Sequence, residues 1–354
     1  MSPASTEQFL LEQYTGHPAS QLQDLRKALY QSVFGCEHLI TDTSAAAEGI
    51  RREAAEAGPC SREIEALDGP WSRVQLGVLA DGLTPETLSR MFARSAAMSH
   101  GDADALQEKL TVLRRLIRSG ALPYSPAEAE LDDWRKNGFP VCRHSEEYRA
   151  AYRPAYRVLH RTYVRLLPLL AAIDRALAEN PRVLLAIEGG AASGKSTLAD
   201  LLTAIYPDTA LFHADDFFLR PEQRTAARYA QPGGNLDRER LESEILIPIS
   251  RNKAAVYRPF NCRTLSLREP VTVLPGRLNI VEGSYSFHPE LARYYDLSVF
   301  LDISPETQRS RILKRNGPEW GQQFFDRWIP LEQTYFHETD TQGRCTLALK
   351  EETR

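Results

Sequence analysis

The spacing of apolar residues predicts helices in the first half of the chain. Between residues 21 and 33, leucine and valine recur every three or four positions, and Gly35 follows as a stop signal. Residues 43–57 are rich in alanine and end before Gly58. We therefore expect residues 1–179 to form a mostly helical domain, although nothing in this pattern assigns it a function.

Capping signals predict the start of two further helices. Thr84 supplies a capping hydroxyl in front of Pro85, which suits the first helical position. Ser125 with Glu128 three residues later fits a capping box, in which each side chain binds the other residue's backbone N–H. Helices are expected to begin at both places.

Two longer segments complete the prediction for this half. Residues 72–79 alternate between apolar and polar, which favours a strand. From 145 to about 177 the pattern is helical, with bends expected at Pro154 and Pro168. An Asn-Pro pair at 180–181 then breaks the helix, and we place the domain boundary there.

The second half follows a different pattern, in which short apolar runs precede polar residues. A continuous apolar run bounded by turn residues is typical of a strand in a parallel sheet that helices cover on both faces. Four such runs occupy residues 183–187, 210–213, 278–281 and 297–301. Residues 180–354 are therefore predicted to be an α/β domain with a parallel sheet flanked by helices.

The first of these runs leads into a glycine-rich loop and then a helix. The loop matches the pattern G-x-x-x-x-G-K-[ST] and comprises Gly189, Gly190, Ala191, Ala192, Ser193, Gly194, Lys195, Ser196 and Thr197. Its backbone N–H groups and the positive end of the helix would face phosphate oxygens. Lys195 would neutralise the outer phosphates, and the Ser196 hydroxyl can bind magnesium. ATP and Mg²⁺ are the expected ligands; an incidental glycine-rich turn is the alternative.

Carboxylates follow two of the other predicted strands. Asp215 and Asp216 come just after the run at 210–213, and Glu282 directly follows the run at 278–281. Ligands of open parallel sheets bind at the carboxyl ends of the strands, which places these side chains beside the loop. A solvated turn is the alternative interpretation of the two aspartates.

The order and spacing of these motifs make residues 182–336 resemble the uridine kinase, phosphoribulokinase and nicotinamide riboside kinase group of P-loop small-molecule kinases. Besides the loop, the matching features are Asp215-Asp216-Phe217-Phe218, Glu282-Gly283 and an arginine-rich helix that begins at Ser304 and stops at Asn316-Gly317. The resemblance implies that Asp215 is the general base toward a substrate hydroxyl and that Glu282 helps hold magnesium. It also implies that Arg311 and Arg315 belong to a lid over the nucleotide, where a solvated helix face is the alternative.

The resemblance is incomplete where uridine kinases recognise their substrate. Those kinases place a base-reading histidine after a tyrosine, whereas this chain has Tyr257-Arg258-Pro259-Phe260. Their ribose-binding aspartate also lacks a clear counterpart. The acceptor pocket is still expected to be lined by Asp216, Phe218, Tyr257 and Arg258, with Arg258 favouring a polar or anionic acceptor. The expected substrate is a nucleoside or a sugar-like alcohol.

Two other functions use the same kind of loop. In a nucleotide-driven switch or assembly ATPase, hydrolysis changes the binding of a partner, and such a protein has no use for a base that faces an acceptor alcohol. The Asp215 block therefore favours the kinase. A GTPase is not expected, because Asn252-Lys253 is followed by two alanines and does not complete the N-K-x-D motif that reads guanine.

Composition narrows the expected environment and partners. The chain has 354 residues, of which 25% are charged and 42% hydrophobic, as in soluble globular proteins. A net charge of −4 gives no reason to expect a nucleic-acid partner. The start lacks a basic and apolar leader, and no apolar run is long enough to cross a bilayer. We therefore expect a cytoplasmic protein without membrane contact. A homo-oligomer is compatible with these features.

Two Cys-x-His triplets leave a second kind of chemistry open in the first half. Cys36, His38, Cys142 and His144 would supply two thiolates and two imidazoles for zinc. Their spacing is tighter than in common zinc motifs, so buried structural cysteines are the favoured alternative. The tyrosines and arginines within 148–161 could face an anionic ligand, and a solvated helix face is the favoured alternative for them.

Overall fold

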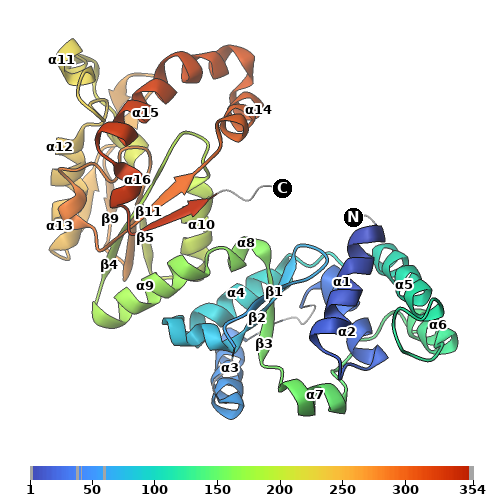
Figure 1. The fold of residues 1–354 in the computed structure, drawn as a ribbon. Coiled ribbons are helices and arrows are strands. Elements are labelled where there is room, and N and C mark those ends of the chain that lie inside the picture. The colour runs from blue at the N-terminus through green and yellow to red at the C-terminus, as the bar shows by residue number, and fades with distance from the viewer. Residues whose placement is uncertain (1–2, 37–39, 41, 59–60, 351–354) are drawn as a thin grey trace. The chain divides into compact units, whose positions relative to one another are not determined.

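The computed structural model describes residues 3–36, 40, 42–58 and 61–350. The chain divides into two compact units, Met1–Ala171 (unit 1) and Ala172–Arg354 (unit 2), which run from blue to green and from green to red in Figure 1. The division falls within helix α9 (Leu167–Glu179). None of the helices in the described ranges is long and apolar enough to cross a membrane.

Unit 1 is mostly helical, as predicted. Its helices are α1 (Pro3–Gly16), α2 (Leu22–Phe34), α3 (Thr43–Ala57), α4 (Pro85–Ala97), α5 (Ala103–Arg118), α6 (Glu128–Lys136), α7 (Glu146–Tyr152) and α8 (Arg161–Val164). The predicted stop after α2 is confirmed, because Gly35 has a φ of 63° and caps the helix. The predicted start of α4 is also confirmed: the Thr84 hydroxyl accepts the N–H of Thr87.

A small antiparallel sheet runs between these helices in the order β1 (Ile64–Ala66), β2 (Trp71–Gln75) and β3 (Tyr156–His160). The strand predicted over 72–79 is confirmed only in part, because a 3₁₀ helix begins at Leu76. Apolar side chains from both helices and sheet, among them Leu29, Leu110 and Val158, form one core.

The long helix predicted from 145 to 177 is wrong, because the segment holds α7, β3, α8 and α9. The residue before a proline is hindered from the helical conformation, and Arg153 in front of Pro154 has a φ of 44°. The chain continues as β3, which pairs with β2. The tyrosines and arginines of 148–161 therefore do not share one helix face.

The capping box predicted at Ser125 is also wrong. Helix α6 begins at Glu128, with Ala127 at the cap position and no side-chain cap. The Glu128 carboxylate binds the guanidinium groups of Arg114 and Arg118 on α5 and does not reach back to Ser125. The Glu128 carboxylate thus forms ion pairs with α5 in place of the predicted cap.

Unit 2 contains a five-stranded sheet in which every pair of neighbours is parallel. Its order is β12 (Leu347–Lys350), β11 (Leu297–Asp302), β4 (Val183–Gly189), β10 (Leu278–Glu282) and β5 (Thr209–His213). Four of these strands were predicted, and the edge strand β12 was not. The central strands β4 and β10 are buried along their whole length, which explains their continuous apolar sequences.

Helices and two short strand pairs complete unit 2. The helices are α10 (Lys195–Ile205), α11 (Ala226–Tyr229), α12 (Arg238–Leu241), α13 (Ile247–Ser250), α14 (Pro305–Gln323), α15 (Ile329–Glu338) and α16 (Thr341–Arg344). Two antiparallel pairs join β6 (Ala255–Tyr257) to β9 (Val271–Val273) and β7 (Phe260–Asn261) to β8 (Ser266–Leu267). Helix α10 packs along β4, β5 and β10. The predicted fold class, a parallel sheet flanked by helices and preceded by a mostly helical region, is confirmed.

Candidate active site

The glycine-rich loop lies between β4 and α10, as the sequence predicts. Gly189 has a φ of 145°, and a Cβ atom there would lie 2.7 Å from the carbonyl oxygen of Leu301 on the neighbouring strand. Gly194 has a φ of 101° and stands directly before α10. Both positions therefore require glycine, one for close approach and one for its backbone conformation.

The side chain of Lys195 curls back over the loop. Its ammonium group donates to the carbonyl oxygens of Gly189 at 2.8 Å and Gly190 at 2.9 Å. The buried Ser193 hydroxyl has no hydrogen-bond partner among the described residues. A cation and an unpaired hydroxyl on a loop that begins a helix suit a phosphate group, which supplies several acceptor oxygens.

Ser196 and Glu282 meet at the carboxyl ends of β4 and β10. The Ser196 hydroxyl donates to the Glu282 carboxylate at 3.2 Å, and His213 Nδ1 lies 2.6 Å from the same oxygen. The Glu282 carboxylate raises the pKa of His213. Within the described residues, no three His, Cys, Asp or Glu side chains form a metal site. Magnesium fits such a partial set, because it commonly uses one or two carboxylates together with phosphate oxygens.

Asp215 and Asp216 stand on a 3₁₀ turn, Ala214–Phe217, directly after β5. The Asp215 side chain is open to solvent, yet the surrounding protein atoms raise its pKa by desolvation, and repulsion from Glu282 adds to this effect. The positive charge of Lys195 opposes the rise. Asp215 therefore lies within electrostatic range of both the loop lysine and the Glu282 carboxylate.

Helix α14 brings one of the two predicted lid residues, Arg311, to the loop. Ser304 caps the helix, and Gly317 breaks it with a φ of 74°, as predicted. The Arg311 guanidinium donates to the carbonyl oxygen of Ala192 at 3.2 Å. Arg315 instead contacts Asn316 and the ring of Phe324, although its charge still reaches Asp215.

Two buried residues that the sequence analysis missed lie directly against the loop. The Glu332 carboxylate, from α15, accepts the N–H of Ala191 at 2.9 Å and the hydroxyl of Ser284 at 2.7 Å. Burial raises the pKa of Glu332, and the Lys195 ammonium opposes this rise. No sequence signal marked Glu332, because it lies in an unremarkable helix far from the loop in sequence.

Glu188 was also missed, although it is a charged residue in a buried strand directly before the loop. Its Oε1 accepts the N–H groups of Gly189 at 3.1 Å and Tyr285 at 2.9 Å. Its Oε2 accepts the N–H of Phe287 at 2.9 Å and the hydroxyl of Tyr335 at 3.2 Å. Complete burial raises the pKa of Glu188 to about 7, against the lowering effect of the backbone N–H groups.

The predicted acceptor residues occupy different environments. Tyr257 is buried and stacks on Phe217, with ring centroids 5.5 Å apart, and its pKa is raised by desolvation and by the charge of Asp216. Phe218 packs partly buried against the same core. The exposed Arg258 donates to the carbonyl oxygen of Arg268 at 2.7 Å. These residues stay candidates for the acceptor pocket.

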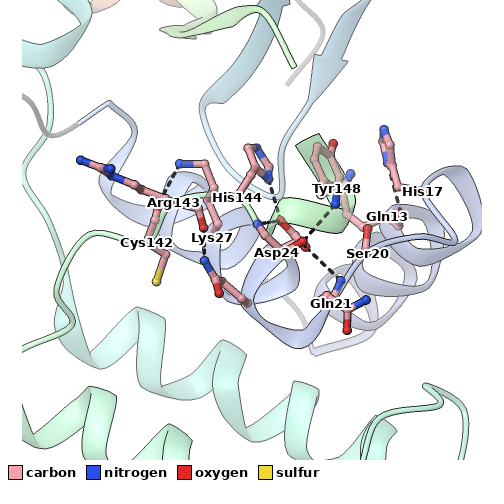
Figure 2. Close-up of polar contacts among 12 residues, drawn as sticks. Gln13, His17, Ser20, Gln21, Asp24, Lys27, Cys142, Arg143, His144 and Tyr148 are labelled. Atoms are coloured by element: carbon pink, nitrogen blue, oxygen red, sulfur yellow. Dashed lines mark hydrogen bonds and ion pairs between the residues drawn. The ribbon is translucent and has the colours of Figure 1, made fainter. Parts of the chain in front are cut away.

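The proposed zinc ligands do not come together in the part of the chain that the structure describes. Cys36 and Cys142 are buried, and the Cys142 sulfur points away from the His144 ring (Figure 2). Both ring nitrogens of His144 contact other side chains, Nδ1 at 2.8 Å from Asp24 and Nε2 at 2.6 Å from Tyr156. His38 lies outside the described residues. The described members of the set are therefore used for packing and hydrogen bonding.

No protein-family model matches the chain, and no curated protein matches it either. Among solved structures, it is similar to a possible uridine kinase from Bacillus stearothermophilus, with 18% identity and a TM-score of 0.39 over 51% of this chain and 98% of that one. It is also similar to a proposed fructose transport system kinase from Silicibacter sp. TM1040, with 19% identity and a TM-score of 0.41 over 50% of this chain and 97% of that one. Similarity at this level carries no information on the substrate.

Proposed function

We propose that unit 2 is an ATP-dependent kinase that phosphorylates a hydroxyl group of a small metabolite, a nucleoside or a sugar-like alcohol. One observation carries the proposal: Asp215 stands on the turn directly after β5, at the end of the sheet where His213 pairs with Glu282, and its pKa is raised. Phosphoryl transfer needs a group that accepts the proton of the acceptor hydroxyl, and a base is most effective when its pKa approaches the working pH.

The loop supports ATP as the phosphoryl donor. Lys195, the Ser193 hydroxyl and the N–H groups at the start of α10 would hold the phosphates. Ser196 and Glu282 would hold magnesium, which neutralises phosphate charge when bound. Arg311 already contacts the loop from α14 and would add a cation to the same side.

The test compares acceptor-dependent ADP release with ATP affinity in two variants and a control. Asp215→Asn keeps the size of the side chain but cannot take up the acceptor's proton, so turnover should fall by about 10²–10⁴-fold while ATP still binds. Asp208→Asn changes an exposed aspartate just before β5 and should have no effect. Lys195→Ala should abolish turnover with the fold intact, because it removes a charge aimed at the phosphates.

The second candidate function is a nucleotide-driven switch or assembly ATPase. It predicts ATP hydrolysis that ignores both the acceptor and the Asp215→Asn substitution. Unchanged turnover in a folded Lys195→Ala protein would rule out both functions. A screen of nucleosides and sugar alcohols with the unmodified protein identifies the acceptor.

A further inference from the structure

A cluster of polar and charged side chains occupies the interior of unit 1, far in sequence from the phosphate loop. We name it the Arg73 cluster, and its members are Gln13, Asp24, Lys27, Gln31, Glu65, Arg73, His144 and Tyr156. They come from α1, α2, the sheet strands and the residues before α7. Part of the cluster is visible in Figure 2, where Asp24 and Lys27 lie on one face of α2 and His144 lies opposite. Burying charged side chains costs free energy, and this cost favours a functional role for the cluster.

Asp24 fixes one side of the cluster. Its Oδ1 accepts from His144 Nδ1 at 2.8 Å and from the N–H of Ser145 at 3.0 Å, and its Oδ2 accepts from the Ser145 hydroxyl at 2.6 Å and from the N–H of Gln21 at 2.9 Å. These bonds hold the pKa of Asp24 down to about 2, although burial opposes them. The carboxylate is thus ionised, and its hydrogen bonds go to groups other than Arg73 and Lys27.

The hydrogen bonds of the cluster continue from Asp24 through His144 to Tyr156. Because His144 Nδ1 donates to Asp24, its Nε2 is left to accept the Tyr156 hydroxyl at 2.6 Å. The ring of Tyr148 stacks on His144 with centroids 4.1 Å apart, which holds the imidazole in place. The Tyr156 ring in turn lies 5.2 Å from the Arg73 guanidinium carbon.

Arg73 is the residue whose bonding is incomplete. Its side chain is 1% exposed. Its Nε donates to Gln31 at 2.9 Å, and one terminal nitrogen donates to Gln13 at 3.1 Å and to Glu65 at 3.1 Å. The other terminal nitrogen has no hydrogen-bond partner among the described residues. A buried guanidinium nitrogen normally donates to an acceptor, so this nitrogen is available to an oxygen atom of a ligand.

Lys27 adds a second cation to the cluster. It lies on α2 between Asp24 and Gln31, is partly exposed, and donates to the carbonyl oxygen of Cys142 at 2.8 Å. Burial, together with repulsion from Arg73, lowers the pKa of Lys27 to about 8. Two cations whose charges repel each other are stabilised by an anion that contacts both.

We propose that unit 1 carries a second ligand site, at which Arg73 and Lys27 bind the oxyanion group, phosphate or carboxylate, of a small molecule. Tyr156 and the Asp24–His144 pair position the guanidinium for this contact. Lys27 lies at the partly exposed margin of the cluster, from which a ligand enters. The site is independent of the kinase proposed for unit 2.

The experiment measures how fast individual lysines of the full-length protein react with a limiting amount of an acetyl ester, by mass spectrometry of the peptides. One arm contains inorganic phosphate and the other contains succinate. At a concentration ten times Kd, the site is about nine-tenths occupied, and acetylation of Lys27 should slow about tenfold. Lys136, an exposed lysine on α6, is the matched control and should react at an unchanged rate.

The two anions distinguish the chemistry of the ligand, because the one that protects Lys27 carries the matching oxyanion. An unchanged Lys27 rate in both arms overturns the proposal, and so does equal slowing of Lys136. Lys195 is measured in the same spectra, so binding of phosphate to the kinase loop is recorded separately. Calorimetry with the protecting anion provides the second readout: Lys27→Gln should remove a binding event that Lys136→Gln and Lys195→Ala retain.

Discussion

The ionisation of His144 predicts that unit 1 loses stability in mild acid. Burial, together with the positive charges of Arg73 and Lys27, lowers the pKa of His144 from its ordinary 6.5 to about 4. Between these values the unfolded chain binds a proton at this histidine and the folded chain does not. The free energy of unfolding therefore falls as the pH drops from 6.5 to 4.

The magnitude follows from that interval. Each pH unit between the two pKa values is worth about 1.4 kcal/mol, so His144 should remove about 3 kcal/mol from the stability of unit 1 by pH 4. This is a large part of the 5–15 kcal/mol that is typical of a domain, estimated roughly. The pKa of Asp24, also lowered, extends the loss below pH 4 toward about 2.

Hydrogen–deuterium exchange measured peptide by peptide suits this prediction, because it reports on α2 separately from unit 2. In the unmodified protein, protection of α2 should decline between pH 6.5 and 4 after correction for the intrinsic pH dependence of exchange. His144→Gln should be less stable at pH 7 and lack this decline, whereas His100→Gln, at an exposed histidine, should behave like the unmodified protein. The same decline in His144→Gln would refute the reasoning.

Two further predictions concern the phosphate loop. Glu332→Gln removes a negative charge beside Lys195 while keeping an oxygen for one of its contacts. ATP should therefore bind about fivefold more tightly, as a gain of about 1 kcal/mol implies; titration calorimetry measures this, and weaker binding would contradict it. Gly189→Ala places a Cβ atom 2.7 Å from the carbonyl oxygen of Leu301 and should lower the free energy of unfolding of unit 2 by more than about 1 kcal/mol in a denaturant titration. Gly16→Ala, in unit 1, meets no atom within 4 Å and should leave the unfolding of unit 2 unchanged.

Sequence reasoning succeeded where short-range signals decide the structure. The apolar runs around β4 and β10 and the loop glycines have local physical causes, so they could be predicted. It failed where distant residues decide: Glu128 binds arginines of α5 instead of capping its own helix, and β3 forms because β2 offers a partner. Glu332 is a similar case, since only the folded chain brings α15 to the loop.

The buried Glu188 carboxylate gives unit 2 a response to acid opposite to that of unit 1. Its pKa of about 7 lies above the ordinary 4.5, so between these values the folded state holds a proton that the unfolded state has lost. Unit 2 should therefore gain stability from this group as the pH falls from 7 to 4.5, while unit 1 loses it through His144. A melting temperature recorded for the whole chain averages the two trends and can stay level across this range. Only a method that separates the units would detect either trend.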